Sequence, residues 1–305
     1  MPADKKIDPY SRLRRTRLYI PGNNPAMIQN AMVFAADSII FDLEDSIIIK
    51  EKDSARILVR KALENIDFGS CEQTVRINAI DTEFFEEDLQ VIIPTALEGI
   101  LLPKTETLED IKKTANLISK IEKDHNIKIG TTKIMPIIET AKGVLNIESI
   151  AQGPRVVCIG LGGEDLTADI GAKRTKEGKE LEYISSKIIL ACAANNIQAI
   201  DTVYSDINDT EGLYLATKKA IEIGFQGKSI IHPSQVEPVH RAFTPTDEEI
   251  RNAKRIIQAY KEAEEKGLGA ITVDDRMIDV PVIKRSKKIL KRAEASGTIL
   301  SDIGD

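Results

Sequence analysis

Cysteine and histidine are scarce in this chain of 305 residues. The cysteines Cys71, Cys158 and Cys192 are too few and too widely spaced for a disulfide framework or a CxxC metal or redox site, so we expect small buried residues. The chain has 3 histidines and no HExxH pair, which argues against a zinc hydrolase. Any metal should therefore be bound mainly by oxygen.

Long apolar runs are missing as well. No run reaches the roughly 18 residues that a membrane-spanning helix needs, and the opening MPADKKIDPYSRLRRTR lacks the apolar stretch of a signal peptide. The formal net charge is −6, which argues against broad nucleic-acid binding. We therefore expect a cytoplasmic protein that uses neither a membrane nor nucleic acid as a partner. One basic run stands out, and a local acidic partner would suffice to explain it: Arg12, Arg14, Arg15 and Arg17.

The chain does contain a regular alternation of short apolar runs and helix-like stretches. Eight runs are rich in β-branched and aliphatic residues: 17–21, 38–43, 74–78, 99–103, 134–138, 156–161, 199–204 and 229–232. Alternation predicts a parallel sheet, and eight units within about 225 residues favour a (β/α)₈ TIM barrel. An open doubly wound sheet is the alternative, but its first turn usually carries GxGxxG, whereas the first turn here is PGNNP.

The pattern changes near residue 244. We predict a barrel over residues 13–243 and a C-terminal helical extension over residues 244–305. Thr246 and Glu249 have the spacing of a capping box that opens a charged helix, and a second helix ends the extension. We expect this tail to be too small for a core of its own, and to pack on the barrel or on a neighbouring subunit.

Charged residues end several of the predicted strands. The active site of a (β/α)₈ barrel lies at the carboxyl ends of its strands, so these residues should gather at one mouth, where they must pair, bind a metal or meet a ligand. In strand order they are Glu44 and Asp45, Arg76, Lys104, Glu139, Glu164 and Asp165, Asp201, and His232.

Two of these carboxylates suggest a metal site. Glu139 and Asp165 would end adjacent strands and could share one ion. Two carboxylates completed by waters and a substrate chelate suit Mg²⁺. The alternative is that each carboxylate caps the following helix or pairs with a lysine.

Arg76 is a permanent cation within VRIN, where a strand interior normally takes an apolar residue. Its planar fork of donors suits an oxyanion or a carboxylate. An internal salt bridge with Glu44 or Asp45 is the alternative, and both roles can hold at once. His232, which precedes Pro233, can equally be a structural hydrogen-bonding residue.

Ten short strings, taken in order, carry a resemblance to a known family: RLYIPGNNPAM, IIFDLEDSI, EKDSAR, VRINAID, LPKTET, IIET, GLGGEDL, AIDTVYSD, GKSIIHP and RMID. They resemble the HpcH/HpaI aldolase superfamily, in particular its citrate lyase beta chains and its citryl-, malyl- and citramalyl-CoA lyases. The resemblance covers about residues 14–296. It implies a (β/α)₈ barrel, Mg²⁺, and cleavage of a carbon–carbon bond in a β-hydroxyacyl thioester.

The resemblance also implies roles for the residues of the mouth. Glu139 and Asp165 would be the Mg²⁺ ligands, and Arg76 would bind the substrate and its thioester. Glu44 and Asp45 would lie near the metal-bound waters.

Three further residues receive roles in the same way. Tyr19 would line the thioester channel, with His232 near it. Asp279, within RMID, would come from the tail of a neighbouring subunit and act as an acid or base. The resemblance therefore implies a homo-oligomer, with a trimer as the expected unit.

We expect the chain to cleave a citryl thioester, carried on an acyl-carrier protein or on CoA, to oxaloacetate and an acetyl thioester. Citrate lyase alpha and gamma subunits would then be its partners. One alternative is a citramalyl-CoA or malyl-CoA lyase, or the reverse Claisen condensation. Another is a non-catalytic subunit that docks a carrier protein through the basic run at residues 12–17.

Overall fold

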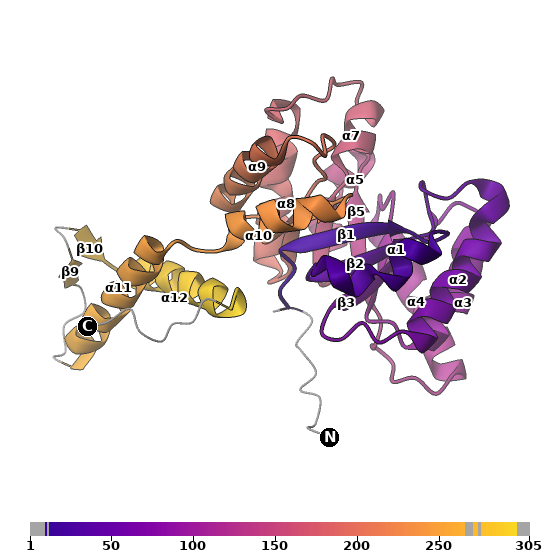
Figure 1. Cartoon of the computed structure of the whole chain (residues 1–305), viewed down its shortest axis with the longest axis horizontal. Coiled ribbons are helices and arrows are strands. Elements are labelled where there is room, and N and C mark those ends of the chain that lie inside the picture. Colours follow the sequence, from indigo (N-terminus) through magenta and orange to yellow (C-terminus); the bar gives the residue numbers. More distant parts are fainter. Residues whose placement is uncertain (1–9, 11, 266–270, 274–275, 298–305) are drawn as a thin grey trace. The chain divides into compact units, whose positions relative to one another are not determined.

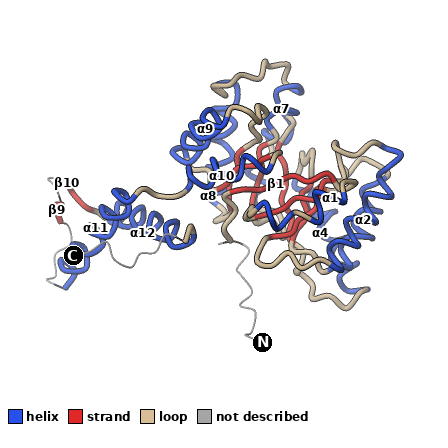
Figure 2. Tube along the Cα trace, viewed as in Figure 1, coloured by secondary structure: helices blue, strands red, loops and turns tan. Residues whose placement is uncertain are grey.

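The computed structural model describes the following residues: 10, 12–265, 271–273 and 276–297. The chain divides into two compact units, residues 1–239 and 240–305. The first unit holds most of the strands, which are red in Figure 2. Within the described residues, no helix is long and apolar enough to cross a membrane.

Eight parallel strands close into a barrel in the order of the sequence, with β8 pairing back to β1. They are β1 (Thr16–Pro21), β2 (Ser38–Asp42), β3 (Glu72–Arg76), β4 (Gly99–Leu102), β5 (Lys133–Ile138), β6 (Cys158–Leu161), β7 (Gln198–Asp201) and β8 (Gly227–Ile230). Each strand overlaps one of the eight predicted runs, so the predicted (β/α)₈ barrel is confirmed. All residues of β2 are buried, as expected for a strand covered on both faces.

Helices cover the outside of the strands (Figure 1). They are α1 (Pro25–Gln29), α2 (Lys52–Asn65), α3 (Phe84–Ile92), α4 (Leu108–Asp124), α5 (Ala141–Leu145), α6 (Ile147–Ala151), α7 (Gly163–Asp169), α8 (Glu182–Ala194), α9 (Thr210–Ile223) and α10 (Val236–Phe243), with short 3₁₀ turns at Ala31–Phe34, Ile49–Glu51, Ile93–Thr95, Lys179–Leu181 and Pro233–Gln235. α4 shows why they form: Thr107 and Asp110 make a capping box, and Ile111, Ile118 and Ile121 are buried on one face.

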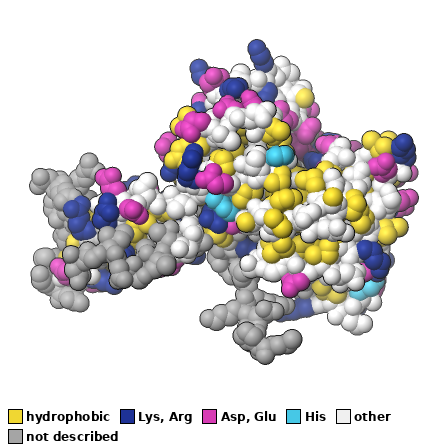
Figure 3. Space-filling view, viewed as in Figure 1, with side chains coloured by type: hydrophobic (Ala, Val, Ile, Leu, Met, Phe, Trp, Pro, Cys, Tyr) yellow, Lys and Arg dark blue, Asp and Glu magenta, His cyan; other side chains and the backbone are white. Residues whose placement is uncertain are grey.

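An apolar cluster fills the barrel interior below its mouth: Ile40, Leu101, Met135, Ile137, Val157, Cys158 and Ile200. Cys71 and Cys192 are buried elsewhere in the unit, and all three cysteines are free thiols, as predicted. Figure 3 shows that apolar side chains are also exposed in the middle of the drawn face of this unit, with acidic and basic side chains around them.

The basic run near the start of the chain is buried at the amino ends of the strands. Three ion pairs join it to acidic residues of the barrel: Arg12–Glu98, Arg14–Glu72 and Arg15–Asp37. Arg14 is 1% exposed, and its Nε and Nη2 donate to Glu72 at 2.8 and 2.6 Å. The predicted local acidic partners are therefore confirmed. The alternative in which this run docks a carrier protein is wrong, because the side chains that would make the contact are inside the fold.

The second unit consists of two helices and a strand pair: α11 (Asp247–Glu265), β9 (Ile271–Val273), β10 (Arg276–Ile278) and α12 (Val280–Ala295). The capping box is present, since Thr246 and Glu249 bond each other's backbone N–H groups at 2.7 and 3.2 Å. The expectation that the tail lacks a core is wrong. β9 and β10 pair antiparallel, and Ile278 joins Ile256 and Ile283 in a buried cluster between the helices.

Candidate active site

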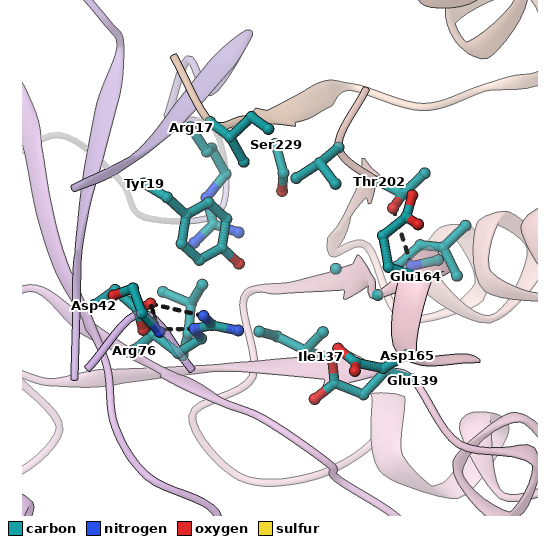
Figure 4. A pocket seen from close by; sticks show the side chains of 18 of the residues that line it. Arg17, Tyr19, Asp42, Arg76, Ile137, Glu139, Glu164, Asp165, Thr202 and Ser229 are labelled. Atoms are coloured by element: carbon teal, nitrogen blue, oxygen red, sulfur yellow. Dashed lines mark hydrogen bonds and ion pairs between the residues drawn. The ribbon is translucent and has the colours of Figure 1, made fainter. Parts of the chain in front are cut away.

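A cavity of about 300 Å³ lies at the carboxyl ends of the barrel strands. Residues that end or directly follow the strands form much of its wall: Pro21, Asp42, Arg76, Glu139, Gly162, Thr202 and Ile231. Figure 4 shows Arg76 and Asp42 at one side and Glu139 and Asp165 at another. The volume is sufficient for a small polar substrate.

Arg76 is clamped by carboxylates. Its Nε and Nη2 donate to the two oxygens of Asp42, both at 2.7 Å, and its Nη1 lies 2.9 Å from Glu44 Oε2 and 3.7 Å from Asp45 Oδ2. The salt bridge considered for Arg76 therefore exists, with Asp42 as an additional bidentate partner. Each Nη nitrogen carries two N–H groups, so one on each is available beyond these contacts. Burial alone would lower the pKa of Arg76, but the hydrogen bonds and charge of Asp42 outweigh it and raise that pKa.

The ring of Tyr19 packs against the guanidinium of Arg76. The ring centroid of Tyr19 lies 5.0 Å from Arg76 Cζ, a cation–π distance. Burial raises the pKa of Tyr19 to about 12, so its hydroxyl stays protonated at neutral pH. Tyr19 lines the cavity, as Figure 4 shows, and packs against the apolar cluster below it.

Glu139 is a buried carboxylate, 3% exposed, at the end of β5. Its pKa is raised to about 8, mainly by burial and also by the charges of Glu44 and Asp165. The backbone N–H of Lys104, which donates to Oε1 at 2.6 Å, opposes this rise. Gly162 makes room for this side chain, because a Cβ there would lie 2.5 Å from Glu139 Oε2. The first glycine of the GGED sequence thus makes room for the carboxylate, and both glycines line the cavity.

Glu139 and Asp165 fit a divalent cation. Across the described residues, neither side chain takes part in an ion pair. No group of three or more His, Cys, Asp or Glu residues is placed to hold a metal among these residues, so the protein would supply only these two carboxylates as ligands. The two carboxyl groups are close enough for the charge of Asp165 to raise the pKa of Glu139, and neither has a cationic partner among the described residues. An ion held by two carboxylate oxygens and completed by water or substrate oxygens is the coordination typical of Mg²⁺.

Three other predicted residues of the mouth are neutralised by partners within the protein. The pairs are Lys104 with Glu44 at 3.0 Å, Glu164 with Arg174 at 3.1 Å, and Asp201 with Lys228. Glu164 lines the cavity, whereas Asp201 does not. Each of these charges therefore has a partner of opposite sign, whereas Glu139 and Asp165 have none among the described residues.

His232 does not line the cavity. His232 is exposed and caps the 3₁₀ turn Pro233–Gln235, where its Nδ1 accepts from the N–H of Ser234 at 3.2 Å. Asp279 belongs to the second unit, is exposed, and caps α12 by accepting from Val282 N at 3.2 Å. His232 therefore has the structural role considered for it from the sequence.

Two charged cavity residues were not predicted from the sequence as site residues, Asp42 and Arg17. Asp42 ends the otherwise apolar strand β2, so it carried the signal that singled out the other strand-end residues. Arg17 lies inside the apolar strand β1. A charge within an apolar strand is the signal that identified Arg76, but in the sequence Arg17 was grouped with its basic neighbours.

Comparisons with known proteins agree with this geometry. Residues 15–233 match the family described as HpcH/HpaI aldolase/citrate lyase. The citrate lyase subunit beta of Leuconostoc mesenteroides subsp. cremoris is 43% identical over 95% of this chain and 97% of its own length. The mitochondrial citramalyl-CoA lyase of Rattus norvegicus is 35% identical over 92% of this chain and 86% of its own length. The CitE protein of Mycobacterium tuberculosis was solved with magnesium, acetoacetate and coenzyme A. It superposes on this chain with a TM-score of 0.79 at 29% identity, and the match covers 93% of this chain and 99% of the CitE chain. This chain therefore belongs to the HpcH/HpaI aldolase/citrate lyase family.

Proposed function

We propose that the chain is a Mg²⁺-dependent carbon–carbon lyase that cleaves a citryl thioester to oxaloacetate and an acetyl thioester. The observation that carries this proposal is the pair Glu139 and Asp165, without a cation partner among the described residues, on the same cavity as Arg76. The 43% identity to a citrate lyase subunit beta and the magnesium and coenzyme A bound to the similar CitE protein support the reaction class.

Glu139 and Asp165 would hold the metal. Bound Mg²⁺ supplies a Lewis acid for the hydroxyl and carboxylate oxygens of the substrate. Glu44 and Asp45, next to Arg76, would orient water at that edge of the site. Tyr19, which lines the cavity, would border the thioester arm.

Arg76 would stabilise the enolate that the leaving acetyl thioester becomes. The substrate hydroxyl would lose its proton to the water that Glu44 and Asp45 orient, and its C–O bond becomes the ketone of oxaloacetate as the carbon–carbon bond breaks. The electrons of the broken bond move toward the thioester carbonyl, and that oxygen gains negative charge. The second N–H groups on the two Nη nitrogens are the donors for this oxygen, and such a donor is worth roughly 3 kcal/mol in the transition state. Asp42 is a positioning residue, because its bidentate contact at 2.7 Å sets the plane of the fork.

None of the carboxylates that line the cavity is free to protonate the enolate carbon. Four carboxylates line the cavity: Asp42, Glu139, Glu164 and Asp165. Two of them are ion-paired, and the other two are assigned to the metal. We propose that Asp279, exposed in the second unit, supplies the acid by reaching the barrel mouth of a neighbouring subunit in a homotrimer.

The reaction itself is tested by assaying the purified chain with citryl-CoA and with a citryl carrier protein, with Mg²⁺ and after chelation. We expect oxaloacetate to form with Mg²⁺ and its formation to stop with EDTA. Since residues 12, 14 and 15 are buried in ion pairs, they should not favour the carrier protein over CoA. Oxaloacetate release that survives complete chelation would contradict the proposal.

The shared site is tested by mixing two variants, Asp279→Asn and Arg76→Ala, each expected to be inactive alone. Asn caps a helix about as well as Asp, so the first variant removes the carboxyl group and keeps α12. Activity should return when subunits exchange, and mixed oligomers that stay inactive would refute the shared site. Light scattering reports whether the particle is a trimer, and co-purification with alpha and gamma subunits tests those partners.

A further inference from the structure

Arg17 is a buried cation without a carboxylate partner. It is 1% exposed, and within the described residues no acidic oxygen lies within ion-pair distance of it. Its Nη1 and Nη2 face only Cys158 Sγ at 3.8 Å and Met135 Sδ at 3.0 Å, and its Nε has no hydrogen-bond partner. Sulfur is a weak acceptor, so these contacts compensate little of the cost of burying the charge.

The residues beside Arg17 on the neighbouring strands are serines. Arg17 pairs in register with Ser38 on β2 and with Ser229 on β8. Neighbours in register in a parallel sheet point to the same face, so Ser38 and Ser229 flank the base of the Arg17 side chain. Ser38 Oγ is buried and also lacks a partner, and Ser229 lines the cavity. Within the described residues, this part of the barrel interior therefore holds two buried donors that have no hydrogen-bond partner, Arg17 Nε and Ser38 Oγ.

Arg17 belongs to the cavity that holds Arg76 and the metal pair. Arg17 and Ser229 line its wall together with Glu139 and Asp165, and Figure 4 shows the first two across the cavity from the last two. Gly160 lines the same wall, and a Cβ there would meet no atom closer than 3.9 Å. The cavity therefore has unfilled space beside Gly160.

We propose that Arg17, assisted by Ser229, binds the second carboxylate of the oxoacid half of the substrate, and thereby selects a thioester whose cleavage releases a dicarboxylic 2-oxoacid. This inference rests on the proposed function. A citryl thioester carries that carboxylate on a CH₂ arm, whereas a citramalyl thioester has a methyl group in its place. The carboxylate supplies the acceptors that the guanidinium lacks, through a charge-assisted contact.

The test compares citryl-CoA with citramalyl-CoA in the unmodified protein and in Arg17→Met. Met removes the charge and keeps a long apolar side chain beside Met135 and Cys158. We expect kcat/KM for citryl-CoA to fall about 100-fold, because a carboxylate buried without its cation partner is costly, while kcat/KM for citramalyl-CoA changes less than about threefold. Arg15→Met is the matched control: it removes a charge two residues away that is paired with Asp37, and should leave the preference unchanged.

Binding gives a second readout that does not depend on turnover. In the presence of Mg²⁺, oxaloacetate should bind Arg17→Met about 100-fold more weakly than the unmodified protein, and pyruvate should bind both equally. Ser229→Ala, a milder change, should weaken oxaloacetate about tenfold and leave pyruvate unaffected, which keeps the proposal testable if Arg17→Met does not fold.

The outcomes separate this inference from the function on which it rests. If the unmodified protein cleaves neither thioester, the proposed function is refuted. If it is active but Arg17→Met loses both substrates equally, or keeps its preference for citryl-CoA, Arg17 is structural and the inference alone fails. If Arg17→Met does not fold, a Ser229→Ala variant that binds oxaloacetate as tightly as the unmodified protein also overturns it.

Discussion

The two ends of the barrel both bury charged side chains, but they balance them differently. At the amino end three arginines meet three carboxylates: Arg12 with Glu98, Arg14 with Glu72, and Arg15 with Asp37. At the carboxyl end Arg76 and Lys104 are matched by Asp42 and Glu44, and two carboxylates remain: Glu139 and Asp165. Among the described residues, these two carboxylates at the mouth, the buried Glu139 and the exposed Asp165, have no ion-pair partner.

This difference shows that burial of charge does not by itself identify an active site. Arg14 and Arg76 are both buried in bidentate pairs, yet only Arg76 borders a cavity beside carboxylates without a counter-charge. Uncompensated buried charge is costly, so it is kept where a ligand compensates it. Arg17 is the converse case, a cation without an anion on the same cavity.

The largest effect should follow from removing a carboxylate of the mouth that has no ion-pair partner among the described residues. Glu139→Gln keeps the shape of the side chain and removes a metal-binding carboxylate, so Mg²⁺-dependent kcat should fall at least about 10⁴-fold while the fold is kept. Turnover of the citryl thioester and Mg²⁺ binding by calorimetry measure it. Near-normal activity in Mg²⁺ would show that the carboxylate is not a ligand, and Asp165→Asn should give the same loss.

Arg76→Lys should come next, with kcat/KM reduced about 10³-fold. A lysine retains the charge but cannot span both oxygens of Asp42 and also present donors to a ligand. Steady-state kinetics with saturating Mg²⁺ provide the measurement, and thermal unfolding controls for stability. Recovery of more than a tenth of the unmodified rate would assign Arg76 a structural role.

Breaking an ion pair at the amino end of the barrel should lower the stability of the fold and leave kcat nearly unchanged. Glu72→Gln leaves Arg14 buried without its counter-ion, so the free energy of unfolding should fall by about 3–5 kcal/mol. Denaturant unfolding measures this loss, and kcat of the folded fraction should stay within about twofold of normal. A large loss of kcat without loss of stability would contradict the distinction between the two ends.

The smallest effect should be a pH dependence that originates at the amino end. Burial would raise the pKa of Glu72, but the charges of Arg14 and its neighbours outweigh burial and lower it below the ordinary value of 4.5. The unfolded chain then binds the proton more readily, so this pair stabilises the fold above about pH 4.5 and the contribution is lost as pH falls through the lower folded pKa. Acid unfolding of the normal protein and Glu72→Gln should converge in that range, and parallel curves would exclude the linkage.

The strands and part of the site could be predicted because they depend on local pattern. A strand covered on both faces reads as a continuous apolar run, so all eight strands were found. The same background made Arg76, Glu139 and Asp165 conspicuous, since a charge that ends an apolar run is costly unless a partner, a metal or a ligand compensates it.

The balance of charge could not be predicted, because it is decided by contacts between residues far apart in the chain. Arg14 and Glu72 are 58 residues apart, and only closure of the barrel brings them together. Four arginines that form one basic run in the sequence are separated in space: three precede or begin the barrel and find carboxylates, while Arg17 enters β1 and points toward the cavity. The sequence by itself determined the barrel and the charged strand ends, and the tertiary structure decided which charges are compensated, because compensation requires a partner within a few ångströms.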